Sequence, residues 1–193
     1  MFKIISTIAI AVALTALGAL AWLATRPAAP KPFAADYHEA LRNHPGSEAS
    51  IARGLESFAS AYANLAHPDI ADRIQSLYAD PMYFNDSLKT FDRRETLVEY
   101  MRATGAMLHN STVRIDQTIR DGRDIFVRWT MEFSAGAGAQ PISSRSVGMT
   151  HLRFDDRGRV VLHQDFWDSA SGLYRNLPVI GYALEQVDRR MAK

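Results

Sequence analysis

The chain has no cysteine in its 193 residues, which excludes disulfide bonds, thiolate nucleophiles and cysteine-ligated zinc or iron–sulfur centres. It also lacks a block of like charge. Because 22 basic and 21 acidic residues leave a formal charge of +1, no nucleic-acid partner is predicted. His109, His151 and His163 lack the close spacing of a zinc site, and no dinucleotide fingerprint or Gly-x-Ser-x-Gly elbow occurs. The sequence therefore predicts neither a metal nor a cofactor.

Charged residues are also absent between Ile4 and Thr25. This apolar run is long enough to cross about 30 Å of hydrocarbon as a helix. We predict that residues 1–26 form a transmembrane anchor of a single-pass membrane protein. A cleaved signal peptide is the alternative, because Ala19-Leu20-Ala21 resembles a cleavage site. Positive charge is greater after the run, at Arg26, Lys31 and Arg42, than before it, at Lys3, which favours a cytoplasmic domain. Signal-like segments at the extreme amino terminus usually translocate the downstream chain, however, and on this ground we predict an extracytoplasmic domain.

Residues 27–46 come after the anchor and begin with three closely spaced prolines. Proline clusters favour an extended chain, so this stretch is predicted to be a Pro-rich tether. The remaining residues, 47–193, are enough for one folded domain.

Helical periodicity dominates the first part of this domain. The pattern predicts a helix that Ser47 could cap, with apolar positions from Ile51 to Leu65, and a second, short helix from Ile70 to Tyr78. After a brief strand from Met82 to Asp86, the segment Asp92-Arg93-Arg94-Glu95 opens a third helix.

The apolar period then changes to two. Alternation from Ile125 to Phe133 is typical of a strand with one buried face, and Asp121-Gly122 is a hairpin signal that joins it to Val113–Ile119. Two further turns give four consecutive antiparallel strands ending near Asp168, followed by a helix from about Ser171 to Met191. The predicted fold class is α+β: a cone-shaped, curved antiparallel sheet packed on three N-terminal helices, with a C-terminal helix.

The last predicted strand carries the densest group of polar and aromatic side chains, His163-Gln164-Asp165-Phe166-Trp167-Asp168. Successive side chains of a strand point to opposite faces. His163, Asp165 and Trp167 are therefore predicted to share one face, and the alternate residues the other. Such a face can line a ligand cavity.

This order of elements and its motifs resemble the nuclear transport factor 2-like superfamily, which includes ketosteroid isomerases, SnoaL-like polyketide cyclases and many noncatalytic members. The resemblance spans roughly Ser47 to Arg190. It rests on five segments: Leu77-Tyr78-Ala79-Asp80, Phe84-Asn85-Asp86, Leu152-Arg153-Phe154-Asp155, Gly158-Arg159-Val160 and residues 163–168. The fold alone does not settle the function, because it hosts several chemistries.

The resemblance implies candidate catalytic residues. Similarity to the isomerases implies that Asp86 is a general base and that Tyr62 stabilises an oxyanion, with Thr150 where those enzymes carry a protonated aspartic acid. Similarity to the cyclases implies instead that Asp168 is the base and that His163 polarises a carbonyl or shuttles a proton.

Each candidate also has an ordinary structural explanation. Asp168 could cap the final helix, Asp86 could stabilise a turn, and Tyr62 could belong to the core. The predicted ligand-binding residues are the acidic and aromatic side chains Phe84, Trp129, Phe133, Asp165 and Trp167.

Three functions remain open on the sequence. The first is a general-base isomerase or cyclase that acts on an apolar carbonyl compound. The second is a noncatalytic carrier of a small apolar molecule. The third is an interaction module that forms a homodimer through the sheet face. Whether the protein is an enzyme is left open by the sequence.

Overall fold

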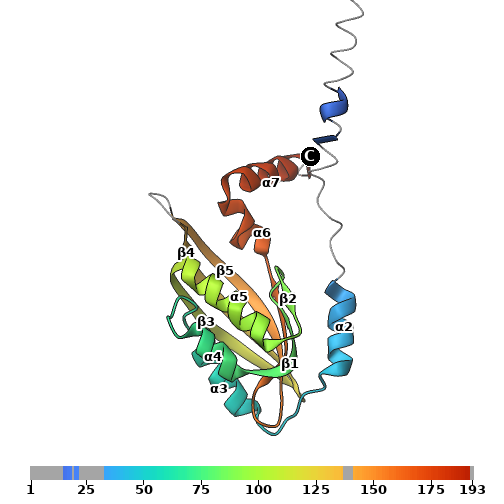
Figure 1. The fold of residues 1–193 in the computed structure, drawn as a ribbon, viewed down its shortest axis with the longest axis vertical. Coiled ribbons are helices and arrows are strands. Elements are labelled where there is room, and N and C mark those ends of the chain that lie inside the picture. The colour runs from blue at the N-terminus through green and yellow to red at the C-terminus, as the bar shows by residue number, and fades with distance from the viewer. Residues whose placement is uncertain (1–14, 19, 22–32, 137–140, 192–193) are drawn as a thin grey trace, which may run out of the picture. The chain divides into compact units, whose positions relative to one another are not determined.

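The computed structural model describes residues 15–18, 20–21, 33–136 and 141–191. Residue contacts divide the chain into a unit of residues 1–35 and a larger unit of residues 36–193. The larger unit is an α+β fold built on one curved sheet (Figure 1). The sheet and the cavity described below belong to this larger unit.

Among the described residues from Phe33 onward, seven helical segments accompany the sheet. They are α2 (Phe33–Asn43), α3 (Ile51–Tyr62), α4 (Ile70–Leu77), α5 (Arg94–Met107), α6 (Ser169–Gly172), the 3-10 helix η1 (Tyr174–Asn176) and α7 (Pro178–Met191). The predicted second helix, Ile70 to Tyr78, is therefore α4 with one extra residue at its end, and the predicted third helix corresponds to α5.

The sheet has six strands in the order β2-β1-β6-β5-β4-β3. Their bounds are β1 (Tyr78–Asn85), β2 (Thr90–Phe91), β3 (Leu108–Asp121), β4 (Asp124–Ala135), β5 (Ile142–Phe154) and β6 (Val160–Trp167). The four consecutive antiparallel strands predicted from the sequence are β3 to β6. The prediction of a wholly antiparallel sheet is wrong in one pairing: β1 joins β6 in parallel, so the sheet is mixed.

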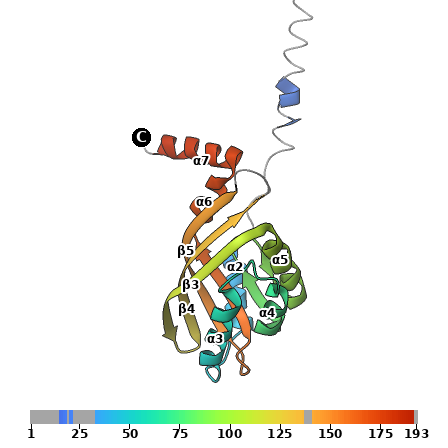
Figure 2. The same ribbon diagram turned by 90° about the vertical axis from the view of Figure 1, so that its left-hand side faces the viewer.

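Helices α3, α4 and α5 pack on one face of the sheet and form the main core with it (Figure 1). β4 shows how this face changes along its length. Ile125 and Val127 are fully buried in the core, whereas Met131 and Phe133, further along the same face, are only partly buried. The long strands β3, β4 and β5 bend toward these helices (Figure 2). One end of the inner face is therefore filled, and the other end is left hollow.

The opposite face of the sheet carries a buried polar cluster beneath α2. Tyr37 Oη lies 2.6 Å from His151 Nδ1, and His151 Nε2 lies 2.6 Å from Asp124 Oδ1. Arg153 donates to Asp124 and also to the carbonyl oxygens of Leu41 and His44, at 2.7 and 3.1 Å. These bonds fasten α2 and the turn after it to β4 and β5.

Two segments differ from the sequence prediction. Residues 33–43 lie within the predicted tether but form α2. Three of the four prolines of that stretch precede Phe33 and Pro45 follows Asn43, so none interrupts the helix. The predicted C-terminal helix is broken into α6, η1 and α7. Pro178 begins α7, as expected for a residue whose missing N–H is harmless only in the first turn.

The predicted membrane anchor lies largely outside the described residues, which include only 15–18 and 20–21 of that stretch. Within the residues that the structure describes, no helix has the length and apolar character needed to cross a bilayer.

The polar cluster beneath α2 should make stability depend on pH. Burial lowers the pKa of His151 below its ordinary value of 6.5, although Asp124 opposes this shift. The unfolded chain then binds a proton that the folded chain resists, so the free energy of unfolding should fall as pH drops through about 6.5. Burial would raise the pKa of Asp124, but hydrogen bonds from Arg153 and His151 outweigh burial and lower it, which extends the loss to more acidic pH.

Urea unfolding between about pH 7.5 and about pH 5.5 tests this expectation. His151→Gln should reduce the loss of stability over this range. His109→Gln, which changes an exposed histidine, should leave it unchanged. A residual dependence is expected from His44, whose pKa is lowered by burial and by Arg153. Equal slopes for wild type and His151→Gln would contradict the prediction.

Candidate functional site

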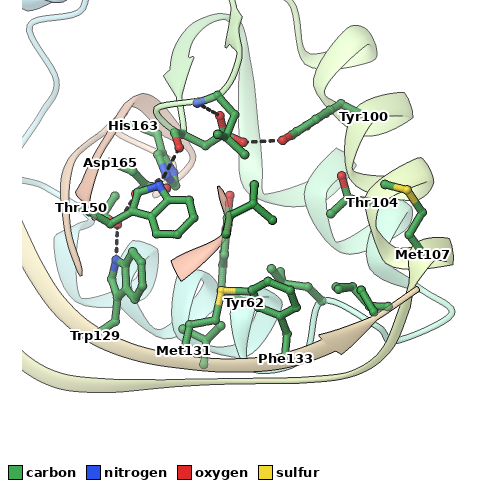
Figure 3. A pocket seen from close by; sticks show the side chains of 18 of the residues that line it. Tyr62, Tyr100, Thr104, Met107, Trp129, Met131, Phe133, Thr150, His163 and Asp165 are labelled. Carbon is green, nitrogen blue, oxygen red and sulfur yellow. Dashed lines mark hydrogen bonds and ion pairs between the residues drawn. The ribbon is translucent and has the colours of Figure 1, made fainter. Parts of the chain in front are cut away.

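The hollow end of the inner sheet face forms a cavity of about 710 Å³. This volume is within the range of cavities that hold small molecules. Most of its wall is apolar and comes from α3, the turn after it, α5 and the inner faces of β3 and β4, namely Phe58, Ala59, Leu65, Ala106, Met107, Leu108, Val113, Ile115, Met131 and Phe133. The polar side chains are few. Figure 3 shows Thr150, His163 and Asp165 on one side of the cavity and Tyr100, Thr104 and Met107 on the other.

Asp165, on β6, is held by two neighbours on the same sheet face. Thr150 Oγ1 donates to Asp165 Oδ1 at 2.5 Å, and His163 Nε2 lies 2.9 Å from the same oxygen. Trp129 Nε1 donates in turn to Thr150 Oγ1 at 2.8 Å. Within the described residues, no donor is bonded to the other oxygen, Asp165 Oδ2. One carboxylate oxygen is thus fixed, and the second remains available to a ligand.

His163 connects Asp165 to two buried tyrosines. Tyr78 Oη lies 2.7 Å from His163 Nδ1, and Tyr62 Oη lies 2.5 Å from Tyr78 Oη. Because a carboxylate oxygen only accepts, His163 Nε2 must carry the ring proton. With one ring proton, Nδ1 accepts from Tyr78. The hydroxyl proton of Tyr78 is then used in its bond to His163, so in the bond between the two tyrosines Tyr62 is the donor and Tyr78 Oη the acceptor. We call this chain, from Tyr62 through Tyr78 and His163 to Asp165, the tyrosine relay.

The hydroxyl protons of the two relay tyrosines are firmly held. Burial raises the pKa of Tyr62 well above its ordinary value, and the charges of Asp165 and Asp86 raise it further against the opposing bond to Tyr78. Burial also raises the pKa of Tyr78, with added contributions from Tyr62 and the same two carboxylates. Neither tyrosine is therefore suited to act as a base near neutral pH.

Asp86 supplies the second carboxylate of the cavity wall, just after the end of β1. Its Oδ1 accepts from the backbone N–H groups of Leu88 and Lys89 at 2.8 and 2.7 Å, and its Oδ2 accepts from Tyr100 Oη at 2.5 Å. Both oxygens are thus in use. The backbone bonds are those of an aspartate-stabilised turn, as the structural interpretation of Asp86 predicted.

Nine of the ten predicted site residues line this one cavity. They are Tyr62, Phe84, Asp86, Trp129, Phe133, Thr150, His163, Asp165 and Trp167. The tenth, Asp168, is not among the lining residues. Its side chain accepts a hydrogen bond from the Ser171 backbone N–H at 3.0 Å and caps α6, which confirms the capping interpretation. The predicted common face of His163, Asp165 and Trp167 is also confirmed.

Three residues of the site, Tyr78, Tyr100 and Thr104, have no site role in the sequence prediction. Tyr78 is completely buried and joins the relay, Tyr100 bonds Asp86, and Thr104 lines the cavity four residues after Tyr100 on α5. The helical pattern places Tyr100 on an inward face but does not indicate its partner. For metals, the described part of the chain has no three acidic or histidine side chains arranged to hold an ion.

Solved structures with this fold include enzymes and proteins of undetermined activity. An LEH-like epoxide hydrolase from M. tuberculosis is 18% identical, with a TM-score of 0.53 over 72% of this chain and 96% of the other. A hypothetical protein with a ketosteroid isomerase-like fold from Catenulispora acidiphila, in complex with trimethylamine, is 20% identical, with a TM-score of 0.53 over 62% and 88%. A candidate SnoaL-like polyketide cyclase from Shewanella putrefaciens is 16% identical, with a TM-score of 0.52 over 62% and 92%. At these identities the likeness shows a shared fold.

Sequence comparison identifies the family. No curated protein matches the chain. The family model of the SnoaL-like domain, however, matches residues 55–163. This segment holds α3 from Leu55 onward, α4, α5, the first five strands and β6 as far as His163. It covers 109 of the 193 residues, counted from 55 to 163 inclusive. The chain belongs to the SnoaL-like domain family.

Proposed function

We propose that the domain binds a small, mainly apolar molecule in this cavity and that Asp165 accepts a proton from it or from a water molecule beside it. One observation carries the proposal: Asp165 Oδ1 is held by Thr150 and His163, while Oδ2 has no bonded donor among the described residues. A fixed carboxylate at the wall of an apolar cavity is suited to general-base chemistry.

Asp165 is a better candidate for the base than Asp86 or Asp168. Asp86 already receives three donors, including two from its own turn, so a ligand would have to compete with them. Asp168 caps a helix outside the cavity wall. Of the three, only Asp165 both lines the cavity and has a carboxylate oxygen with no bonded donor among the described residues.

The carbonyl chemistry implied by the isomerases receives less support from the geometry. Forming an enolate requires a hydrogen-bond donor aimed at the developing oxyanion. Tyr62 donates into the relay and Thr150 donates to Asp165, so both predicted oxyanion donors are already committed. The isomerase or cyclase hypothesis needs a general base and an oxyanion donor, and the geometry supports the base, Asp165, better than it supports the donor. The epoxide hydrolase with this fold makes an apolar epoxide a second substrate class to test.

Membrane attachment through residues 1–26, an extracytoplasmic domain and homodimer formation through the sheet face stay predictions from the sequence. They are compatible with a ligand cavity on the inner sheet face and are not needed for it.

Binding in the cavity can be tested by filling it. Ala59, on α3, lines the cavity, whereas Ala52 on the same helix is exposed and does not. Ala59→Trp should abolish the fluorescence increase of Nile red, a neutral apolar dye, and Ala52→Trp should leave it intact. Circular dichroism checks that both variants fold. Equal dye binding by wild type and a folded Ala59→Trp variant would show that the cavity is not the binding site.

The role of Asp165 can be tested on compounds that bind. Apolar epoxides, enones and ketones that stabilise the protein are incubated with it, and mass spectrometry detects addition of water or exchange with solvent deuterium. Asp165→Asn should keep binding but lower turnover at least about 100-fold. Asp168→Asn, outside the cavity, should turn over as wild type does. Turnover that survives in Asp165→Asn would rule out this base, and binding without turnover by the wild type would indicate a carrier.

The direction of the relay gives a spectroscopic prediction. In wild type, ¹⁵N NMR should show the His163 ring proton on Nε2 and an acceptor at Nδ1. Tyr78→Phe leaves Tyr62 and Nδ1 without their shared partner and should cost about 1–3 kcal/mol of stability. A proton found on Nδ1 in wild type would contradict the relay as described.

A further inference from the structure

We infer that the natural ligand carries a positively charged nitrogen on an apolar body, and that this nitrogen binds at the part of the cavity wall that holds Asp165 and Asp86. The inference rests on the proposed function, because it takes the cavity as the ligand site. It adds the chemical class of the ligand.

The first argument is charge. Asp86 and Asp165 are acidic, and no lysine or arginine occurs among the described residues that line the cavity. Arg128 is on β4 but is exposed and lies outside the lining set. Two carboxylates in a mainly apolar wall, without a basic side chain beside them, favour a cationic guest over a neutral or anionic one.

The second argument is the balance of donors and acceptors. The hydroxyl groups of Thr150, Tyr62, Tyr78 and Tyr100 and the indole N–H groups of Trp129 and Trp167 all bond to acceptors within the protein. His109, the remaining histidine of the wall, is exposed and follows Leu108, which pairs with Ala135 at the end of β4. Ala135 is eight residues along β4 from Val127, the partner of Thr150, so His109 lies far from the Thr150 end of the cavity. The hydroxyl of Thr104 also lines the cavity, on the side opposite Asp165 (Figure 3). The wall around Asp165 therefore offers an acceptor, Asp165 Oδ2, and its donors are already bonded within the protein.

The third argument is the aromatic surround. Trp129 is linked to Asp165 through Thr150, and Trp167 Nε1 donates to the backbone oxygen of Asp86 at 2.8 Å. An indole ring thus accompanies each carboxylate. The faces of aromatic rings attract cations, and they do so more strongly where water is excluded.

The electrostatic influence of the two acids supports a shared site. Burial raises the pKa of Tyr100, and the charges of both Asp86 and Asp165 raise it further. The same two charges raise the pKa of Tyr62 in addition to burial. Tyr62 and Tyr100 come from different helices, α3 and α5, and both line the cavity, so the negative potential extends across it.

These features discriminate among ligand head groups. A carboxylate would meet like charge, and a ketone would find no uncommitted donor beside Asp165. An alcohol could donate one hydrogen bond to Asp165 but would leave both negative charges without a counter-charge. A protonated amine satisfies the open acceptor and supplies that charge.

A matched set of adamantane derivatives tests this order with one apolar body. Isothermal titration calorimetry of the domain with 1-aminoadamantane, 1-adamantanol, 2-adamantanone and 1-adamantanecarboxylate should show the amine binding at least about tenfold more tightly than the alcohol, with the carboxylate weakest. Asp165→Asn and Asp86→Asn should each reduce the preference for the amine. Asp168→Asn should preserve it, because that carboxylate lies outside the cavity wall.

The outcomes separate this inference from the proposed function. Binding of the alcohol or ketone as tightly as the amine would overturn the cationic ligand and leave the cavity in place as a binding site. An amine preference that persists in both cavity variants would also overturn it. If no member binds to wild type, and Nile red binding is unaffected by Ala59→Trp, the proposed function itself fails.

Discussion

The site depends on the pair of hydrogen bonds that Asp165 Oδ1 accepts from Thr150 and His163. A carboxylate in a mainly apolar wall is costly unless donors compensate it. Because His163 Nε2–H donates a hydrogen bond to Asp165, Nδ1 is an acceptor, and this fixes the direction of both tyrosine hydroxyls behind it. The orientation of three side chains, Tyr62 on α3, Tyr78 on β1 and His163 on β6, therefore depends on one charged group.

Strand register brings these groups together. Thr150 on β5 pairs with Asp165 on β6, and Val127 on β4 pairs with Thr150. On the other edge of β6, the parallel pairing with β1 places Phe84 beside His163. A slip of one residue would turn these side chains to the other sheet face, where His151 and Arg153 hold α2. The polar clusters on the two faces thus both specify the same register.

Periodicity explains how much could be predicted from the sequence. Period two places Trp129, Phe133 and Asp165 on inner faces because it depends only on local geometry. The helical pattern assigns Tyr78 to the end of a helix, but α4 ends at Leu77 and Tyr78 begins β1, where its hydroxyl meets His163. A partner 85 positions away leaves no local pattern. The distinction between Asp86 and Asp165 is likewise inaccessible from sequence, since it depends on which carboxylate oxygens are already bonded in the folded chain.

The most direct test of the account is a crystal structure of the domain with a bound small molecule. The account predicts that the polar group of the ligand lies within about 3.2 Å of Asp165 Oδ2 and that its apolar body contacts Met131 and Phe133. Thr150 and His163 should keep their bonds to Oδ1 in that complex. A ligand that leaves Asp165 without a contact and turns its polar group toward the exposed His109 would contradict it.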